Sequence, residues 1–87
     1  MKVYFELEAG ILSRSSIREQ LNNSKSKIEH WYPGSHVLLT ENKSLFDSKF
    51  YFEADNLPES AKNHMELWID GIKSKIKITY YSWTYIG

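Results

Sequence analysis

The chain has 87 residues, which is enough for one domain over residues 1–87 but not for two separate cores. Eleven Lys and Arg balance eleven Asp and Glu, and 41% of the residues are hydrophobic, so the composition excludes disordered and fibrous chains. The absence of cysteine excludes disulfide frameworks, thiolate metal sites and cysteine nucleophiles, and it favours a cytoplasmic protein. No apolar run is long enough for a membrane span, and none has the pattern of a signal peptide.

The balanced charge is unevenly distributed along the chain. Residues 41–70 contain seven acidic and three basic side chains, whereas residues 71–87 contain three lysines and no acidic residue. The neutral total argues against a general nucleic-acid binder, which is normally basic. The acidic middle predicts either an ordinary solvated surface or a surface that meets a basic partner.

Residues 2–8 alternate between apolar and polar side chains, which predicts a half-buried strand. Its two sides carry Val3, Phe5 and Leu7, and Tyr4, Glu6 and Glu8.

Residues 13–30 follow as a predicted helix with a thin apolar stripe, and a Pro-Gly pair ends it. Ser16 and Glu19 have the spacing of a capping box at its start. Ser13 and Ser15 are alternative caps.

The next two segments predict an antiparallel hairpin, because only a short turn over residues 42–44 separates them. Residues 36–41 form a short strand whose register stays open, since three apolar residues are consecutive. Residues 45–54 form the second strand, and one side of it carries Phe46, Phe50 and Phe52.

A second helix is predicted to begin near Asn56, which can cap it, and Pro58, which fits a first helical turn. Apolar residues then recur at helical spacing at Ala61, Met65, Trp68, Ile69 and Ile72. Residues 75–86 alternate as a long strand. We expect one side to face the core with Ile76, Ile78 and Tyr80, and the other to be exposed with Lys77, Thr79, Tyr81, Trp83 and Tyr85.

The order of these elements is strand, helix, strand, strand, helix, strand. The connections favour an α+β ferredoxin-like βαββαβ sandwich, in which a four-stranded antiparallel sheet carries both helices on one face. The expected strand order is 4-1-3-2. This fold hosts many unrelated functions, so it names none of them.

The sheet face without helices is the predicted interaction surface, because rings and carboxylates gather there by strand parity. Tyr and Trp at the centre of a polar rim are typical of protein interfaces. The candidate partner-binding residues on this face and at the acidic start of the second helix are Tyr4, Glu6, Glu8, Tyr51, Glu53, Asp55, Glu59, Tyr81 and Trp83. Three alternatives stay open: cross-strand stabilisation without a partner, self-association through this face, and a ligand on the helical side near Arg14, Arg18, Lys25 and Lys27.

Catalytic and metal-binding patterns are missing from the sequence. The three histidines, His30, His36 and His64, have no metal-ligand spacing. Glu6 and Glu8 share a face, but an open sheet face is not the cleft that shifts the pKa of a catalytic carboxyl. No nucleophile elbow or Gly-rich phosphate loop is present. We therefore expect a protein that is not an enzyme and uses no metal or cofactor.

Two families that share this fold provide weak local resemblances. The loop over residues 9–14 resembles the phosphate loop of acylphosphatases in having one Gly and one Arg, but it lacks the Gly-rich pattern. Residues 49–52 resemble the third strand of RNA-recognition motifs, in which aromatic rings stack on bases. The glycines of that motif are absent, and Glu6, Glu8 and Glu53 would repel phosphate.

The character of the whole chain resembles the small single-domain immunity proteins that bacteria pair with polymorphic or contact-dependent growth inhibition toxins. The shared features are short length, no cysteine, no catalytic set, rings beside carboxylates, and acidic stretches over residues 46–51 and 55–59. The resemblance implies a cytoplasmic protein that binds and neutralises a toxin domain, with a nuclease among the candidate targets. The alternative functions are a homodimeric small-ligand-binding domain and an RNA-binding domain.

Overall fold

The computed structural model describes residues 1–75 and 80–86, and the side chains of Lys73, Lys75 and residues 80–86 lie outside that description. The elements in chain order are β1 (Lys2–Gly10), α1 (Arg14–Trp31), β2 (His36–Lys43), β3 (Asp47–Asp55), the 3-10 turn η1 (Glu59–Ala61), α2 (Lys62–Lys75) and β4 (Tyr80–Ile86). Among the described residues, no helix is long and apolar enough to cross a membrane.

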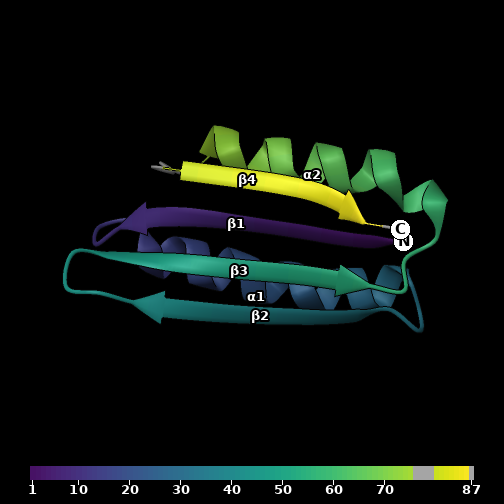
Figure 1. The fold of residues 1–87 in the computed structure, drawn as a ribbon, viewed down its shortest axis with the longest axis horizontal. Coiled ribbons are helices and arrows are strands. Elements are labelled where there is room, and N and C mark those ends of the chain that lie inside the picture. The colour runs from purple at the N-terminus through teal and green to yellow at the C-terminus, as the bar shows by residue number, and fades with distance from the viewer. Residues whose placement is uncertain (76–79, 87) are drawn as a thin grey trace.

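The strands form an antiparallel sheet in the order β2-β3-β1-β4, and both helices lie on one of its faces (Figure 1). The short turn between β2 and β3 makes a hairpin, whereas each helix connects two strands that are consecutive along the chain but not adjacent in the sheet. The predicted ferredoxin-like α+β arrangement, with an antiparallel sheet and two helices, is confirmed. No described element covers the other face of the sheet, which we call the open face.

Alternation along β1 and β3 builds the core, because every second side chain of these strands is buried beneath the helices. Phe5 and Phe52 stack with ring centroids 4.9 Å apart, and the Trp68 ring of α2 lies 5.4 Å from Phe5 and 5.0 Å from Phe52. The Trp68 indole Nε1–H donates to the Ser24 hydroxyl of α1 over 2.7 Å. Trp68 therefore joins both helices to the sheet.

The start of α1 differs from the predicted capping box. The helix begins at Arg14, so Ser16 lies within its first turn and does not cap it. The Ser13 backbone N–H donates to Gly10 over 3.0 Å, and the Ile17 N–H returns to the Ser13 carbonyl over 3.1 Å. This tight turn starts the helix with backbone hydrogen bonds, and the Ser13 side chain makes no capping bond.

The start of α2 also lies later than predicted. Asn56 does not cap it, because Asn56 adopts a positive φ of 59° in the preceding loop and donates its side-chain amide to the Gly34 carbonyl over 2.9 Å. Pro58 precedes η1, and α2 begins only at Lys62. The loop thus uses Asn56 to hold the neighbouring turn at Gly34 instead of opening a helix.

The end of α2 extends into the segment predicted as a strand. The helix continues past Gly71 to Lys75, and β4 begins at Tyr80 instead of residue 75. The predicted core residues Ile76 and Ile78 lie outside the described residues.

The backbone register of β4 differs from the predicted parity. Opposite residues of an antiparallel ladder share a face, and Tyr81 is opposite Leu7 while Trp83 is opposite Phe5. These two positions align with the helix-covered side of β1, so the prediction that placed them on the open face is wrong in register. Large apolar or aromatic residues occupy both parities of this segment, and the period-two pattern therefore does not select a face.

Candidate functional site

Two loops meet at one end of the sheet. One connects β1 to α1 and the other is the turn between β2 and β3. The Ile11 backbone N–H donates to the Phe46 carbonyl over 2.8 Å. The Arg14 guanidinium donates to the carbonyls of Ser44 and Asp47 over 2.9 and 3.2 Å, so it holds the two loops together.

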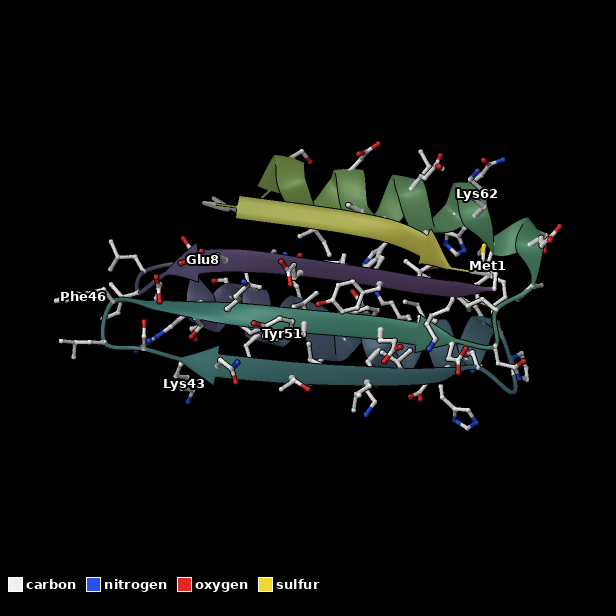
Figure 2. The ribbon with its side chains drawn as sticks, in the orientation of Figure 1. Met1, Glu8, Lys43, Phe46, Tyr51 and Lys62 are labelled. Atoms are coloured by element: carbon white, nitrogen blue, oxygen red, sulfur yellow. The ribbon has the colours of Figure 1, made fainter. Side chains whose placement is uncertain are left out.

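Four large apolar side chains project from these loops into solvent. Their exposed fractions are 50% for Ile11, 94% for Leu12, 75% for Leu45 and 73% for Phe46, and we call this group the apolar tip. Figure 2 shows Phe46 at one end of the molecule and Met1 at the other. Contiguous exposed apolar groups on small proteins usually mark interaction sites.

The turn at the tip has an unusual composition for a hairpin. Ser44 N–H donates to the Asp47 carbonyl over 2.9 Å, and the Ser44 hydroxyl also donates to the Asp47 carboxylate. Leu45 and Phe46 therefore occupy the two central positions, where Asn, Asp and Gly are the usual residues. The fold does not need large apolar side chains at these positions, because neither is buried. Residues that depart from the usual composition of a turn without stabilising the fold indicate a functional role.

Two carboxyl groups lie beside the apolar tip, and we call them the acidic pair: Glu8 of β1 and Asp47 of β3. A hydrogen bond with Asp47, together with the negative charge of Asp47, raises the pKa of Glu8. Asp47 accepts hydrogen bonds from Ser44 and Glu8, and these lower its own pKa. The two groups thus influence each other's pKa, and a cation brought by a partner would stabilise both in the charged form.

The β1 and β3 members of the predicted cluster lie side by side on the open face, but their charges are satisfied within the chain. Tyr4 is opposite Glu53, and Tyr51 is opposite Glu6. The Tyr4 hydroxyl donates to Glu6 over 3.0 Å, and desolvation followed by this bond raises the pKa of Tyr4. Lys2 pairs with Glu53 at 2.9 Å.

Lys49 lies on the same face, opposite Glu8 of β1. Its ammonium lies 3.7 Å from a Glu6 oxygen and 5.6 Å from the centroid of the Tyr51 ring. The carboxylates expected to meet a basic partner are therefore already close to lysines of their own sheet. This arrangement favours the alternative of cross-strand stabilisation for the centre of the face.

The remaining predicted residues do not extend this cluster. Asp55 and Glu59 are exposed near the end of the molecule opposite the apolar tip, where β3 ends and η1 begins (Figure 1). The backbone positions of Tyr81 and Trp83 align with the helix-covered side of β1. The predicted surface is thus divided between the two ends and the centre of the sheet.

Sequence reasoning missed the apolar tip. The sequence pattern predicts Phe46 within the second hairpin strand, on the same side as Phe50 and Phe52, but β3 begins at Asp47 and Phe46 lies in the turn. The sequence does contain a signal for this surface. Ile11, Leu12 and Leu45 are large apolar residues next to Gly or Ser, in predicted loops or at their boundaries. Apolar residues at such positions are rare enough to mark a surface.

Arg18, one of the cations expected on the helical side, serves the fold. Its guanidinium donates to both Glu41 oxygens over 2.6 and 2.8 Å, and the buried Ser48 hydroxyl donates to Glu41 over 2.7 Å. Chiefly the Arg18 bond, assisted by Ser48, lowers the pKa of Glu41 to about 2. This cluster joins α1, β2 and β3 and is not a free docking site.

The histidines make no metal site in the part of the chain that the structure describes. His64 of α2 shares a 2.8 Å hydrogen bond with the Tyr32 hydroxyl, and its ring lies 4.4 Å from that of Trp31. His64 therefore packs the end of α1 against α2.

Comparisons with known proteins identify the fold alone. No family model and no curated protein matches the chain. Among solved structures, the de novo designed protein Ferredog-Diesel matches with a TM-score of 0.67 at 14% identity, covering 98% of this chain and 85% of the design. The de novo designed protein Foldit4 matches with a TM-score of 0.64 at 11% identity over 100% of both chains. The designed ferredoxin-fold protein LFR1 1 has a TM-score of 0.65 at 14% identity, covering 100% of this chain and 88% of the design.

Proposed function

We propose that this chain is a non-enzymatic protein-binding module that neutralises a toxin domain, as the resemblance to bacterial immunity proteins implies. The observation that carries the binding role is the apolar tip, in which Leu12 and Phe46 are mostly exposed on loops tied to each other by hydrogen bonds. A fixed apolar projection loses little conformational entropy when it is buried, so it is suited to anchor a complex.

The charges beside the tip specify the chemistry of the partner. Glu8 and Asp47 place negative charge next to Phe46, which disfavours an anionic membrane or an RNA phosphate as the target. They favour a protein pocket that is apolar at its centre and has Lys or Arg at its rim. A basic active-site cleft, such as that of a nuclease toxin, has this character.

A tip-to-tip homodimer receives less support than a complex with a pocket. A stable interface buries about 800 Å² on each partner, and two tips that meet end to end would bury little beyond their four apolar side chains, whereas a pocket also covers the flanks of the tip. Two copies would also bring their acidic pairs together. The open face remains the second candidate surface for the partner, with Tyr51 as its central ring.

Photo-crosslinking tests which surface meets the partner. The photoreactive residue p-benzoylphenylalanine is placed at Phe46, and in matched proteins at Tyr51 and at the exposed residue Thr40 of β2. We expect a specific adduct from position 46 and none from position 40. Thr40 is opposite Tyr51 on the open face, so adducts from position 51 or 40 and none from position 46 would assign the site to the open face instead.

The partner that crosslinking identifies is then purified without a crosslink, and calorimetry measures how much the tip contributes to its binding. We expect Phe46→Ser to weaken binding by ~2 kcal/mol, about thirtyfold in Kd, because an anchoring ring is lost. Thr40→Ser is the control and should bind like the unchanged protein. For the neutralising role, cells that express the partner should survive with the unchanged chain and die with Phe46→Ser. A partner that is not toxic would contradict neutralisation while leaving the binding role intact.

A further inference from the structure

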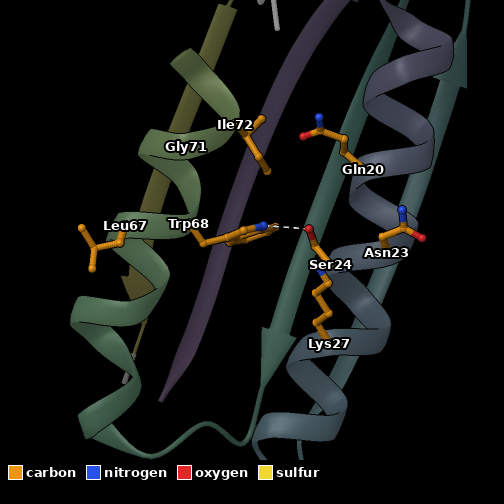
Figure 3. Close-up of a pocket in the computed structure, with 8 residues that line it drawn as sticks. All are labelled: Gln20, Asn23, Ser24, Lys27, Leu67, Trp68, Gly71 and Ile72. Carbon is orange, nitrogen blue, oxygen red and sulfur yellow. Dashed lines mark hydrogen bonds between the residues drawn. The ribbon is translucent and has the colours of Figure 1, made fainter. Parts of the chain in front are cut away.

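A groove of about 410 Å³ runs between the two helices, on the side of the molecule away from the open face (Figure 3). Gln20, Asn23 and Lys27 of α1 form one wall, and Gly71 and Ile72 of α2 form the other, from which the Trp68 ring extends across the floor. The volume lies within the range of small-molecule sites, which is roughly 300–1,000 Å³. Neither the apolar tip nor the acidic pair contributes to this groove, so its role is independent of the proposed toxin binding.

The floor of the groove is a fixed aromatic surface. Figure 3 shows the Trp68 indole directed across the space between the helices toward Ser24, and the 2.7 Å hydrogen bond between them holds it there. Phe5 and Phe52 support the indole from the sheet side. Trp68 is nevertheless only partly buried, so part of its ring remains accessible from the groove. Such a ring is prepared to contact an apolar group without reorganisation.

Gly71 keeps the groove open beside this floor. Glycine weakens a helix relative to alanine, and Gly71 lies within α2. Packing does not require it, because a Cβ built at Gly71 would meet no atom within 4 Å. The absent side chain therefore leaves space between Trp68 and Ile72 that the fold does not use.

The two walls differ in chemistry. The α2 wall is apolar at Trp68 and Ile72, whereas the α1 wall offers the amides of Gln20 and Asn23 and the ammonium of Lys27. Lys27 is the single charged side chain among the described residues that line the groove. We propose that the groove binds an amphipathic organic anion, with a carboxylate at Lys27 and an apolar chain against Trp68.

Titration with decanoate, followed by ¹H–¹⁵N NMR, tests this site. We expect decanoate to shift the indole N–H resonance of Trp68 to saturation and to leave that of Trp31, which lies against His64, unchanged. Decyltrimethylammonium has the same chain with the opposite charge and should produce no saturable shift at Trp68. Equal responses to the two probes would overturn the proposal, because the charge of Lys27 would then not discriminate between an anion and a cation.

Matched variants test the charge of Lys27 and the open space beside Gly71 separately. Lys27→Gln should raise the Kd for decanoate about threefold to fivefold, as expected for a solvent-exposed ion pair, while Lys25→Gln on the same helix should leave it unchanged. Gly71→Leu should abolish the Trp68 shift by filling the groove, and the dispersion of the same spectra reports whether each variant is folded. If Lys27→Gln binds decanoate as tightly as the unchanged protein, or if folded Gly71→Leu still shows the shift, the site is refuted.

Discussion

Trp68 contributes to stability through two kinds of contact. Its ring packs on Phe5 and Phe52, and its N–H donates to Ser24. We expect Trp68→Ala to lower the free energy of unfolding by ~3–5 kcal/mol, measured by urea denaturation, because a large cavity would open above both rings. Trp68→Phe keeps most of the ring and should cost less. A loss below ~1 kcal/mol for the alanine variant would remove Trp68 from the core.

Glu41 makes the stability of the protein sensitive to acid. Its pKa is about 2 in the folded protein and near 4.5 when unpaired, so the charged form is stabilised by folding. This contribution is complete above pH 4.5 and is lost as the pH falls from 4.5 through 2, because the unfolded chain takes up the proton first. Discounted for the partial exposure of Arg18, it amounts to roughly 1–3 kcal/mol.

Denaturation of Glu41→Gln at pH 7, 4.5 and 2.5 checks this assignment. We expect the variant to be less stable at pH 7 and to lose less stability than the unchanged protein between pH 4.5 and 2.5. Glu59→Gln, at an exposed position in η1, should retain the pH dependence of the unchanged protein. Parallel pH profiles for Glu41→Gln and the unchanged protein would show that the Arg18 pair does not stabilise the fold.

The boundary between β3 and its turn separates two phenylalanines of different function. Phe46 is 73% exposed, whereas Phe50 is fully buried. We expect Phe46→Ser to change the free energy of unfolding by less than ~0.5 kcal/mol and Phe50→Ser to cost more than ~3 kcal/mol in the same denaturation experiment. Similar losses of unfolding free energy for both variants would indicate that Phe46 is buried as Phe50 is.

Gly71 is expected to limit the stability of α2. Because a Cβ meets open space there, Gly71→Ala should raise the free energy of unfolding by ~0.5–1 kcal/mol through helix propensity alone. Thermal and urea denaturation measure the gain, with Asn63→Gln, at another exposed position of the same helix, as the control. A destabilised Gly71→Ala protein would indicate that the helices approach each other more closely at this point.

Alternation made β1 and β3 predictable from sequence, because only one side of each strand carries apolar residues and burial then fixes the face. The apolar stripe of α2 was equally clear through Met65, Trp68 and Ile69. Phe46 escaped prediction because it continues the apolar parity of Phe50 and Phe52, while the turn that exposes it depends on hydrogen bonds of Ser44 and Asp47. The face of β4 was ambiguous for the opposite reason, since both of its sides carry rings or branched apolar groups.

At the scale of the whole molecule, neutral total charge coexists with a local negative site at the acidic pair. We expect the double substitution Glu8→Gln/Asp47→Asn to slow association with the crosslinked partner, more at low salt than at high salt, and to leave dissociation nearly unchanged. Phe46→Ser should instead speed dissociation. Stopped-flow and surface-binding kinetics distinguish the two, and equal salt dependence of association with and without the acidic pair would contradict its steering role.

The molecule is elongated, with dimensions of 37 × 21 × 20 Å, and the apolar tip lies at one end of the long axis (Figure 2). The start of β1 and the end of β4 meet at the other end, where Lys2 is opposite Ile86. A surface, a fluorophore or a second protein attached through either terminus would therefore hold the tip pointing outward and unobstructed. The length of the molecule in this way keeps Leu12 and Phe46 away from a bead or a sensor chip to which the protein is attached.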